Sequence, residues 1–165
     1  MVRLLSHSGN IVPIESTNLT VPLVPAGTGA CGSFIWISSI LVPGGYCEID
    51  KYAKQAYEAM YDMGSELYLD DARKIEPEQL PDLDLLVGGF PCQSFSIAGA
   101  RKGFDDTRGT LFFEIARIAA VKKPKYLFLE NVPGLLNHDQ GRTFETILCT
   151  LDKLGYDVCW QVLNS

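Results

Sequence analysis

The sequence predicts an α/β domain with a doubly wound, mainly parallel sheet. Short apolar runs at residues 83–87 and 126–129 favour strands in the interior of a sheet, and the second has the continuous hydrophobicity of a strand covered on both faces. Apolar residues also recur at the i, i+3, i+4 spacing of amphipathic helices. Alternating strands and helices favour βαβ units, whose strand carboxyl ends meet at one ligand-binding edge.

Composition narrows the class of protein. With 165 residues, 47% of them hydrophobic, we expect one domain with its own core. The five cysteines are an odd number without a Cys-x-x-Cys pair, which indicates neither a disulfide framework nor a metal site. Without a secretory signal or a long apolar run, we expect a cytoplasmic protein that does not enter a membrane. The net charge of −6 argues against the chain binding the phosphate backbone of a nucleic acid by itself.

The first 44 residues are the least regular part of the chain. Residues 1–24 show no sustained periodicity, and we expect arm and edge structure with a possible strand at 21–24. Residues 25–32, Pro-Ala-Gly-Thr-Gly-Ala-Cys-Gly, have glycines that let backbone approach a ligand at a strand-to-helix turn. A flexible surface loop fits the same residues.

Two acidic strand ends follow. Residues 45–50 predict a strand, and the next helix has an apolar stripe with Asp50 as its N-cap: Ala53, Ala56, Tyr57 and Met60. Residues 66–69 predict a second strand, closed by Asp70 and Asp71. Ionised carboxylates accept hydrogen bonds and suit ribose hydroxyls or an exocyclic amine. Solvated strand ends of an acidic protein are the alternative.

The second half of the chain repeats the pattern. A helix that Pro124 ends has its stripe at Leu111, Ile115, Ile118 and Ala119. After the strand at 126–129, a helix over 141–154 has Phe144, Ile147, Leu148, Leu151 and Leu154 on one side. A last strand is expected at 156–163.

Cys92 is the candidate nucleophile. It follows a strand in a Gly-Gly-Phe-Pro turn, whereas Cys149 and Cys159 fall inside apolar helix and strand patterns. A cysteine reacts as its thiolate, which nearby cations favour, and Arg101, Lys102 and Arg108 follow in the next loop.

Glu130 is the candidate acid, because it ends the strand at 126–129. A protonated carboxyl opposite a thiolate can donate a proton to a ring nitrogen and make the heterocycle electrophilic. A Cys92/His138 pair of hydrolase type is a rival, although His138 lies in a polar turn.

Several motifs together resemble one family. They are Gly-Phe-Pro-Cys-Gln-Ser-Phe-Ser at 89–96, Lys-Gly-Phe at 102–104, Asp-Thr-Arg-Gly-Thr-Leu-Phe at 106–112 and Glu-Asn-Val at 130–132. In this order they resemble the DNA (cytosine-5) methyltransferases of bacterial restriction-modification systems, over residues 45–165. The resemblance implies a Rossmann-like methyltransferase core that uses S-adenosylmethionine, releases S-adenosylhomocysteine and acts on double-stranded DNA with a flipped-out cytosine.

The resemblance also implies roles for single residues. Cys92 attacks C6 of the cytosine, and Glu130 protonates or hydrogen-bonds N3. Glu48 binds the ribose, Ile49 packs on the adenine and Asp71 contacts its amino group. The other cofactor-binding residues it implies are Ala26, Gly27, Gly29, Ala72, Gly89, Pro91 and Leu111. Residues 92–111 correspond to a mobile loop that closes over DNA, with Gln93, Ser96 and Arg108 as its DNA-binding residues.

The chain departs from the family pattern in two places. Residues 25–32 replace the family's Phe-x-Gly-x-Gly-Gly, and 33–39 do not predict the helix that usually follows. The chain also ends at Ser165, before the family's Gln-Arg-Glu-Arg motif, its target-recognition domain and its final helix. We therefore expect a partial catalytic domain, inactive by itself and in need of a missing segment or a complementary chain.

The second departure has a structural consequence. In the family a later strand inserts antiparallel between the strands expected here at 126–129 and 156–163, so we expect unpaired strand edges there. The alternative function is an inactive, truncated relic that binds a cofactor or a partner.

Overall fold

The computed structural model describes residues 2–7, 35–39, 42–61, 64, 66–91 and 111–163. Its elements are β1 (Val2–His7), β2 (Ile35–Ser39), β3 (Val42–Cys47), α1 (Lys51–Met60), β4 (Leu67–Leu69), η2 (Ala72–Lys74), η3 (Pro77–Gln79), β5 (Leu85–Gly89), α3 (Leu111–Lys122), β6 (Tyr126–Asn131), η6 (Pro133–Gly141), α4 (Arg142–Lys153) and β7 (Asp157–Val162). The mixed α/β class is confirmed.

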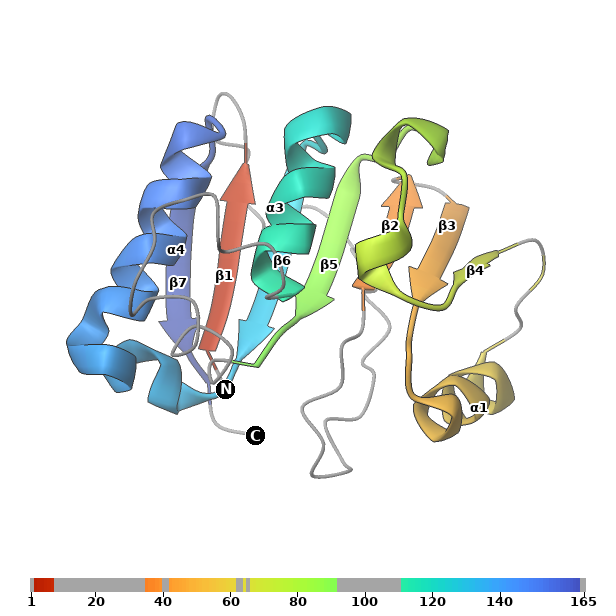
Figure 1. The fold of residues 1–165 in the computed structure, drawn as a ribbon, viewed down its shortest axis with the longest axis horizontal. Coiled ribbons are helices and arrows are strands. Elements are labelled where there is room, and N and C mark those ends of the chain that lie inside the picture. The colour runs from red at the N-terminus through yellow and green to blue at the C-terminus, as the bar shows by residue number, and fades with distance from the viewer. Residues whose placement is uncertain are drawn as a thin grey trace.

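The strands form one sheet in the order β4-β3-β2-β5-β6-β1-β7 (Figure 1). Five of the seven described strands, β3 to β7, run in the same direction, and β1 and β2 run against them. Only β3–β4 and β5–β6 are parallel neighbours, so four of the six described pairings are antiparallel. The expectation of a mainly parallel sheet is not confirmed, because two segments from the irregular N-terminal region insert between strands that share a direction.

β1 corrects the expectation that the N-terminus is an arm or an edge. All six of its residues pair with β6, from Val2 opposite Asn131 to His7 opposite Tyr126, and all six pair with β7 on the other side. The inner edges of β6 and β7, expected to be unpaired, are therefore both hydrogen-bonded. β7 is the outermost described strand on this side of the sheet.

β2 replaces the helix that the family pattern places after the glycine-rich segment. It is antiparallel to β3 and to β5, and its register with β3 shifts between Ile37 and Ser38. Residues 25–32 and the possible strand at 21–24 lie outside the described residues. The absence of a helical pattern at 33–39 thus agrees with the strand at 35–39.

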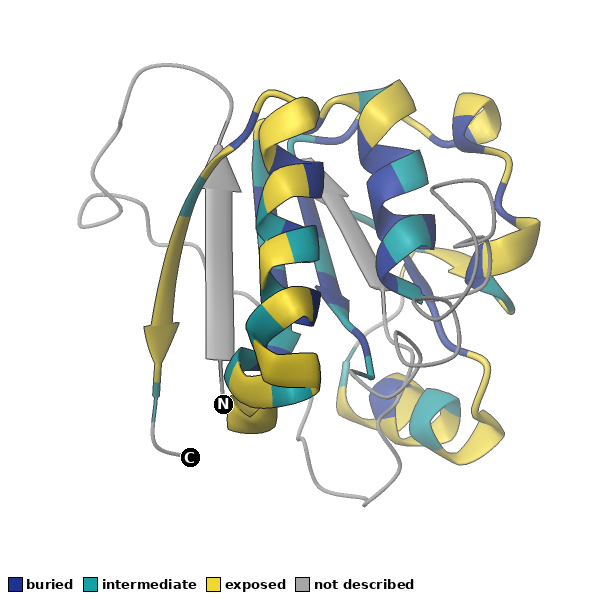
Figure 2. Cartoon of the chain, turned by 60° about the vertical axis from the view of Figure 1, so that its left-hand side comes forward, coloured by how far each residue is buried: buried dark blue, intermediate teal, exposed yellow. Residues whose placement is uncertain are grey.

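The main core lies between the sheet and the helices α3 and α4, which cover the same face (Figures 1 and 2). Side chains from both layers are fully buried there: Leu86, Leu127 and Leu129 from the sheet, Ile115 and Ile118 from α3, and Ile147 and Leu151 from α4. These residues confirm the apolar stripes expected on both helices. α3 also buries Phe112 outside its expected stripe, and the ring centroid of Phe112 lies 5.3 Å from that of Phe90.

The opposite face carries a smaller cluster. Tyr57 of α1 packs on Tyr46, with ring centroids 4.6 Å apart. Leu85, which points away from the main core, belongs to the same buried cluster. Two residues of the expected stripe on α1 were wrong, since Ala56 and Met60 are exposed, whereas Ala53 is half-buried. The described elements therefore place only one helix on this face and do not establish a doubly wound sheet.

β5 extends two residues beyond the expected 83–87, through Gly88 and Gly89. Gly88 is buried beneath α3, and a Cβ atom on it would come within 2.5 Å of Cδ1 of Ile115. Here the glycine permits close packing of helix on strand instead of ending the strand. Among the described helices, none is long and apolar enough to cross a membrane.

A proline in β1 tests its interior position. In a strand paired on both sides, successive N–H groups bond alternately to the two neighbours, so Leu5→Pro removes one bond whichever way it points. We expect a loss of roughly 1–3 kcal/mol in the free energy of unfolding, measured by denaturant titration. Leu5→Val keeps the N–H group and is the control. Equal unfolding midpoints for the two variants would contradict the position of β1.

Candidate functional site

The strands β3, β4, β5 and β6 end at the same edge of the sheet (Figure 1). β3 and β4 end side by side, with Cys47 opposite Leu69, while Gly89 of β5 lies opposite Glu130 of β6. The reversed strand β2 separates these two pairs, so they are two strand spacings apart, about 10 Å. The described site residues therefore form two clusters along one edge.

Glu48 belongs to the first cluster. It follows β3, is only 2% exposed, and donates its backbone N–H to the carbonyl of Leu69 at 3.1 Å. Its Oε1 accepts the N–H of Asp50 at 2.7 Å. Burial raises the pKa of Glu48, and the N–H groups of Asp50 and Ile49 oppose that rise. With these N–H contacts the carboxylate still keeps lone pairs for hydroxyl donors.

Ile49 and Asp50 complete the turn after β3. The Ile49 side chain is 57% exposed beside the buried Glu48, so an apolar surface adjoins the carboxylate. Asp50 is the predicted N-cap of α1, and its Oδ1 accepts the N–H groups of Tyr52 at 2.8 Å and Ala53 at 2.9 Å. The cap confirms the prediction and fixes where the helix begins.

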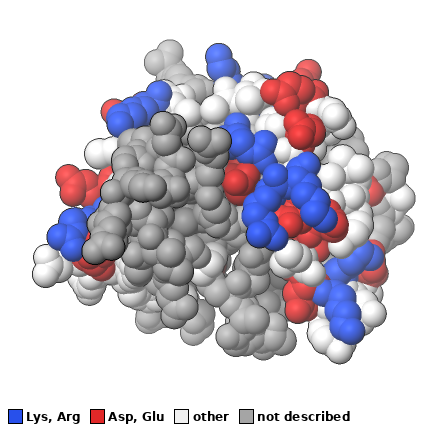
Figure 3. Space-filling view, viewed as in Figure 1, with Lys and Arg blue, Asp and Glu red and all other residues white. Residues whose placement is uncertain are grey.

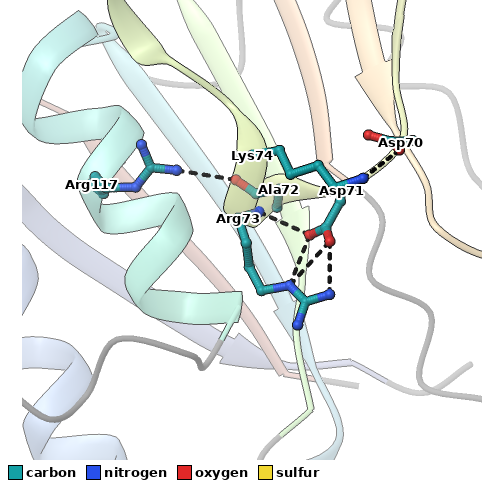
Figure 4. Close-up of polar contacts among 6 residues, drawn as sticks. All are labelled: Asp70, Asp71, Ala72, Arg73, Lys74 and Arg117. Carbon is teal, nitrogen blue, oxygen red and sulfur yellow. Dashed lines mark hydrogen bonds and ion pairs between the residues drawn. The ribbon is translucent and has the colours of Figure 1, made fainter.

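Asp71 follows β4 and caps η2 (Figure 4). Its Oδ1 accepts the backbone N–H of Arg73 at 3.0 Å, and the Arg73 guanidinium donates to both carboxylate oxygens at 2.7–3.1 Å. These hydrogen bonds from Arg73 lower the pKa of Asp71 to about 2. Asp71 therefore stays an ionised acceptor above that pH, beside the buried Ala72.

Asn131 organises the second cluster. Its side chain is buried at the end of β6, and Nδ2 donates to the carbonyl of Phe90, just beyond β5. Its Oδ1 accepts the N–H of Val132 at 2.9 Å. One amide group thus joins the ends of β5 and β6. It holds Phe90, the residue before Pro91, to Asn131, the residue after Glu130.

Glu130 lies on the sheet face away from α3. Along β6 the side chains alternate, with Leu127, Leu129 and Asn131 buried and Glu130 half-buried. Its neighbour Gly89 is where the chain leaves β5 toward Pro91, the residue before Cys92. Glu130 is therefore at the strand end where it was expected.

Seven of the predicted site residues lie outside the described residues: Ala26, Gly27, Gly29, Cys92, Gln93, Ser96 and Arg108. That Cys92 and Glu130 face a common pocket stays a prediction, and so does the rival Cys92/His138 pair. The predicted cofactor wall residues Gly89 and Pro91 are half-buried at the end of β5, and Leu111 is half-buried at the start of α3.

His138 has a local partner. Its Nδ1 lies 2.7 Å from Oγ1 of Thr143, which ties η6 to the first turn of α4. The other cysteines correct one expectation: Cys149 and Cys159 are exposed, because the first lies on the outer side of α4 and the second on the outermost described strand. Cys47 is buried, and burial raises its pKa to about 12, which makes it a poor nucleophile.

Two side chains that organise this edge were missed by the sequence analysis. Asn131 was part of a quoted motif but was not assigned a role. Arg117 of α3 donates to the carbonyls of Ala72 and Ile75, more than 40 residues away in the chain. The only sequence signal for it is the i, i+3 spacing from Glu114, which predicts a local ion pair.

Basic side chains on the face shown in Figure 3 lie next to acidic ones. Ion pairs among the described residues include Arg73–Asp71, Lys74–Asp70, Arg117–Glu114 and Lys122–Asp82. These ion pairs compensate much of the positive charge locally. On the described part of this face it does not form a continuous strip for a phosphate backbone.

Comparison with known proteins identifies relatives of this chain. The family model for C-5 cytosine-specific DNA methylase matches residues 43–165. Type II methyltransferase M1.ScrFI of Lactococcus lactis subsp. cremoris is 59% identical over 67% of the chain, and type II methyltransferase M.NgoBI of Neisseria gonorrhoeae is 54% identical over 72%. Orphan methyltransferase M.SPRI of Bacillus phage SPR is 48% identical over 73%.

These matches cover 28% of M1.ScrFI, 36% of M.NgoBI and 28% of M.SPRI. The chain therefore spans about a third or less of the relatives it matches. The matched part contains Glu48, Asp71, Cys92 and Glu130, and the atypical residues 1–42 lie outside the family match. The alternative of an inactive relic gains no support from these matches.

Asn131→Asp tests the link between β5 and β6. The variant replaces the Nδ2 donor with an acceptor that faces the carbonyl of Phe90. We expect a loss of roughly 1–3 kcal/mol in the free energy of unfolding. Because burial raises the pKa of the new carboxyl, the loss should increase as the pH rises above the ordinary range of aspartate.

Urea titrations at pH 4 and pH 8 measure that loss. Asn137→Asp is the control, because it makes the same change at an exposed position of η6. If both variants unfold at the same urea concentration, Asn131 does not join the two strands.

Proposed function

The chain belongs to the C-5 cytosine-specific DNA methylase family, and from that premise we propose that it is the catalytic part of a DNA (cytosine-5)-methyltransferase. The proposed reaction transfers a methyl group from S-adenosylmethionine to C5 of a cytosine in double-stranded DNA. The observation that carries the proposal is the family match over residues 43–165, because it includes both Cys92 and Glu130.

Cys92 is the proposed nucleophile and Glu130 the proposed acid. The Cys92 thiolate adds to C6 of the cytosine, while protonated Glu130 gives its proton to N3. The resulting enamine is nucleophilic at C5, where the methyl group is added. Loss of the C5 proton to a base then expels the Cys92 thiolate, and N3 returns its proton to Glu130. The half-buried position of Glu130 at a strand end supports its role as a proton donor.

The first cluster fits the adenosine part of S-adenosylmethionine, which when bound supplies an electrophilic methyl group on its sulfonium. Ribose hydroxyls and an adenine amino group are donors, and the cluster presents two carboxylate acceptors, Glu48 and Asp71. Ile49, the residue after Glu48, has an exposed apolar side chain that suits the face of the adenine ring. Ala72 adjoins Asp71 in η2, and Pro91 and Leu111 complete the proposed wall.

The cytosine has to leave the base stack to be attacked, because its ring faces are covered in a duplex. We assign DNA contacts to Gln93, Ser96 and Arg108, in the segment between β5 and α3. The net charge of −6 and the paired cations of the described face give little affinity for phosphates. We therefore propose that target recognition is supplied by polypeptide outside these 165 residues.

A covalent trap tests the catalytic assignment. Fluorine at C5 cannot leave as a proton does, so a duplex with 5-fluorocytosine should stay bonded to Cys92 after methyl transfer. We expect an adduct when S-adenosylmethionine and a complementing polypeptide from a matched relative are present, detected by mass spectrometry of the Cys92 peptide. Cys92→Ser should give no adduct, and Glu130→Gln should slow its formation by about 10²-fold or more.

The control is Cys149→Ser, which alters an exposed thiol and should trap at the wild-type rate. An adduct on Cys92→Ser would overturn the role of Cys92. Methylation of mixed-sequence DNA by the 165-residue chain without the complementing polypeptide would refute the proposed requirement for further polypeptide.

The raised pKa of Glu48 predicts a pH dependence of cofactor binding. Only the ionised carboxylate accepts bonds from both ribose hydroxyls, and Glu48 is ionised only above its raised pKa. Affinity for S-adenosylhomocysteine should therefore rise with pH, by up to about tenfold per unit, until Glu48 is ionised. Asp71, with its pKa of about 2, stays ionised and adds no dependence.

Calorimetric titrations between pH 4 and pH 8 measure this effect. Glu48→Gln removes the titrating group. The variant should bind S-adenosylhomocysteine more weakly than the wild type, and its affinity should not show the wild-type rise with pH. The difference between the two proteins isolates Glu48 from the titrating groups of the ligand. Identical slopes would contradict the assignment of Glu48 to the ribose.

A further inference from the structure

Arg117 reaches from α3 to the segment that carries Asp71 (Figure 4). Its Nη1 donates to the carbonyl of Ile75 at 2.8 Å and its Nη2 to the carbonyl of Ala72 at 3.1 Å. Its Nε donates to Oε2 of Glu114 at 2.8 Å. One guanidinium therefore holds two backbone carbonyls of another segment while a carboxylate of its own helix orients it.

The geometry requires an arginine. Three nitrogen donors in a planar fork meet three acceptors in different directions, which a single lysine ammonium on a flexible stem does not reproduce. Glu114 is 9% exposed, so its carboxylate depends on this partner and in turn limits the motion of the guanidinium. The contact is thus a rigid strut between α3 and η2.

The strut stabilises one end of a turn whose other end carries a proposed cofactor residue. η2 is three residues long, and its own hydrogen bonds are few: Lys74 N–H to Asp71 O at 3.0 Å and Ile75 N–H to Ala72 O at 3.3 Å. At its start, Asp71 is held by Arg73. Arg117 holds the carbonyl of Ala72, the first residue of η2, and the carbonyl of Ile75, just beyond its end. The direction of the Asp71 carboxylate therefore depends on a turn clamped at both ends.

We propose that Arg117 is a positioning residue for the adenine end of the cofactor site. It acts through η2, whose shape sets where the Asp71 carboxylate and the Ala72 backbone face the adenine. The inference rests on the proposed function, which assigns Asp71 and Ala72 to that contact.

Lys122 provides a matched control on the same helix. Its Nζ donates to the carbonyl of Leu80 at 2.7 Å and lies 3.4 Å from Asp82. Like Arg117, it ties α3 to a backbone carbonyl 42 residues away, but to the segment before β5 instead of the turn at Asp71. Substitution of either Arg117 or Lys122 should loosen the packing of α3. Only substitution of Arg117 should displace Asp71.

The test compares Arg117→Met, Arg117→Lys and Lys122→Met. The double variant Glu114→Gln/Arg117→Met is included because it leaves no buried charge without a partner. Hydrogen exchange in the absence of cofactor reports on the turn itself. We expect the amides of Arg73, Lys74 and Ile75 to exchange about tenfold faster in the Arg117 variants and at the wild-type rate in Lys122→Met.

Calorimetry with S-adenosylhomocysteine reports on the site. Loss of the strut should raise Kd by about tenfold, the change expected for one charge-assisted hydrogen bond. The inosine analogue, which lacks the adenine amino group, should bind the wild type more weakly than S-adenosylhomocysteine does. In Arg117→Met and the double variant that discrimination should disappear, and Arg117→Lys should restore part of it. A merely structural role would leave the discrimination unchanged.

Two results would overturn the inference alone: wild-type exchange of the three amides in the Arg117 variants, or an equal loss of affinity and discrimination in Lys122→Met. A different result would overturn the proposed function. If the wild-type chain binds no S-adenosylhomocysteine, the cofactor assignment fails, and with it the cofactor role of the turn.

Discussion

The buried side chain of Asn131 makes the contacts on which this edge of the sheet, and with it the proposed site, depends. Two parallel strands end there, and the first polar groups beyond them, the carbonyl of Phe90 and the N–H of Val132, have left the regular ladder. Buried backbone groups without partners cost free energy, and one amide with a donor and an acceptor satisfies both. The same bonds keep Pro91 and Glu130 in fixed relation, so the requirement for polar satisfaction also positions the proposed chemistry.

The direction of strands decides which residues meet at that edge, and it was only partly predictable. The pattern of apolar residues located α3, α4 and the strands β4 to β7 to within two residues. Apolar residues recur with the period of a helix, or gather in a short run, where one element faces the core. It also identified Glu48, Asp71 and Glu130 as residues at strand ends. Periodicity carries no information on pairing partners, so the reversed β2 between the two clusters was not foreseen.

The failures have identifiable physical causes. β1 belongs to a region with no sustained pattern, and its place between β6 and β7 is set by backbone pairing, which side-chain patterns do not encode. The stripe of α1 was not borne out as a whole, because Tyr57, which packs on Tyr46, is the only buried residue of this helix. Arg117 was missed because its partners are carbonyls, which every residue possesses, in a segment distant in sequence.

The position of β1 clarifies what the slot between β6 and β7 requires. Those two strands run in the same direction, and each presents a row of N–H and C=O groups to the space between them. An antiparallel strand of six residues satisfies both rows over the length of β6. The family resemblance places a later strand at this point, also antiparallel, so here an N-terminal segment meets the same hydrogen-bonding demand. Because the demand comes from backbone geometry, segments of unrelated sequence can satisfy it, and the slot can hold only one of them at a time.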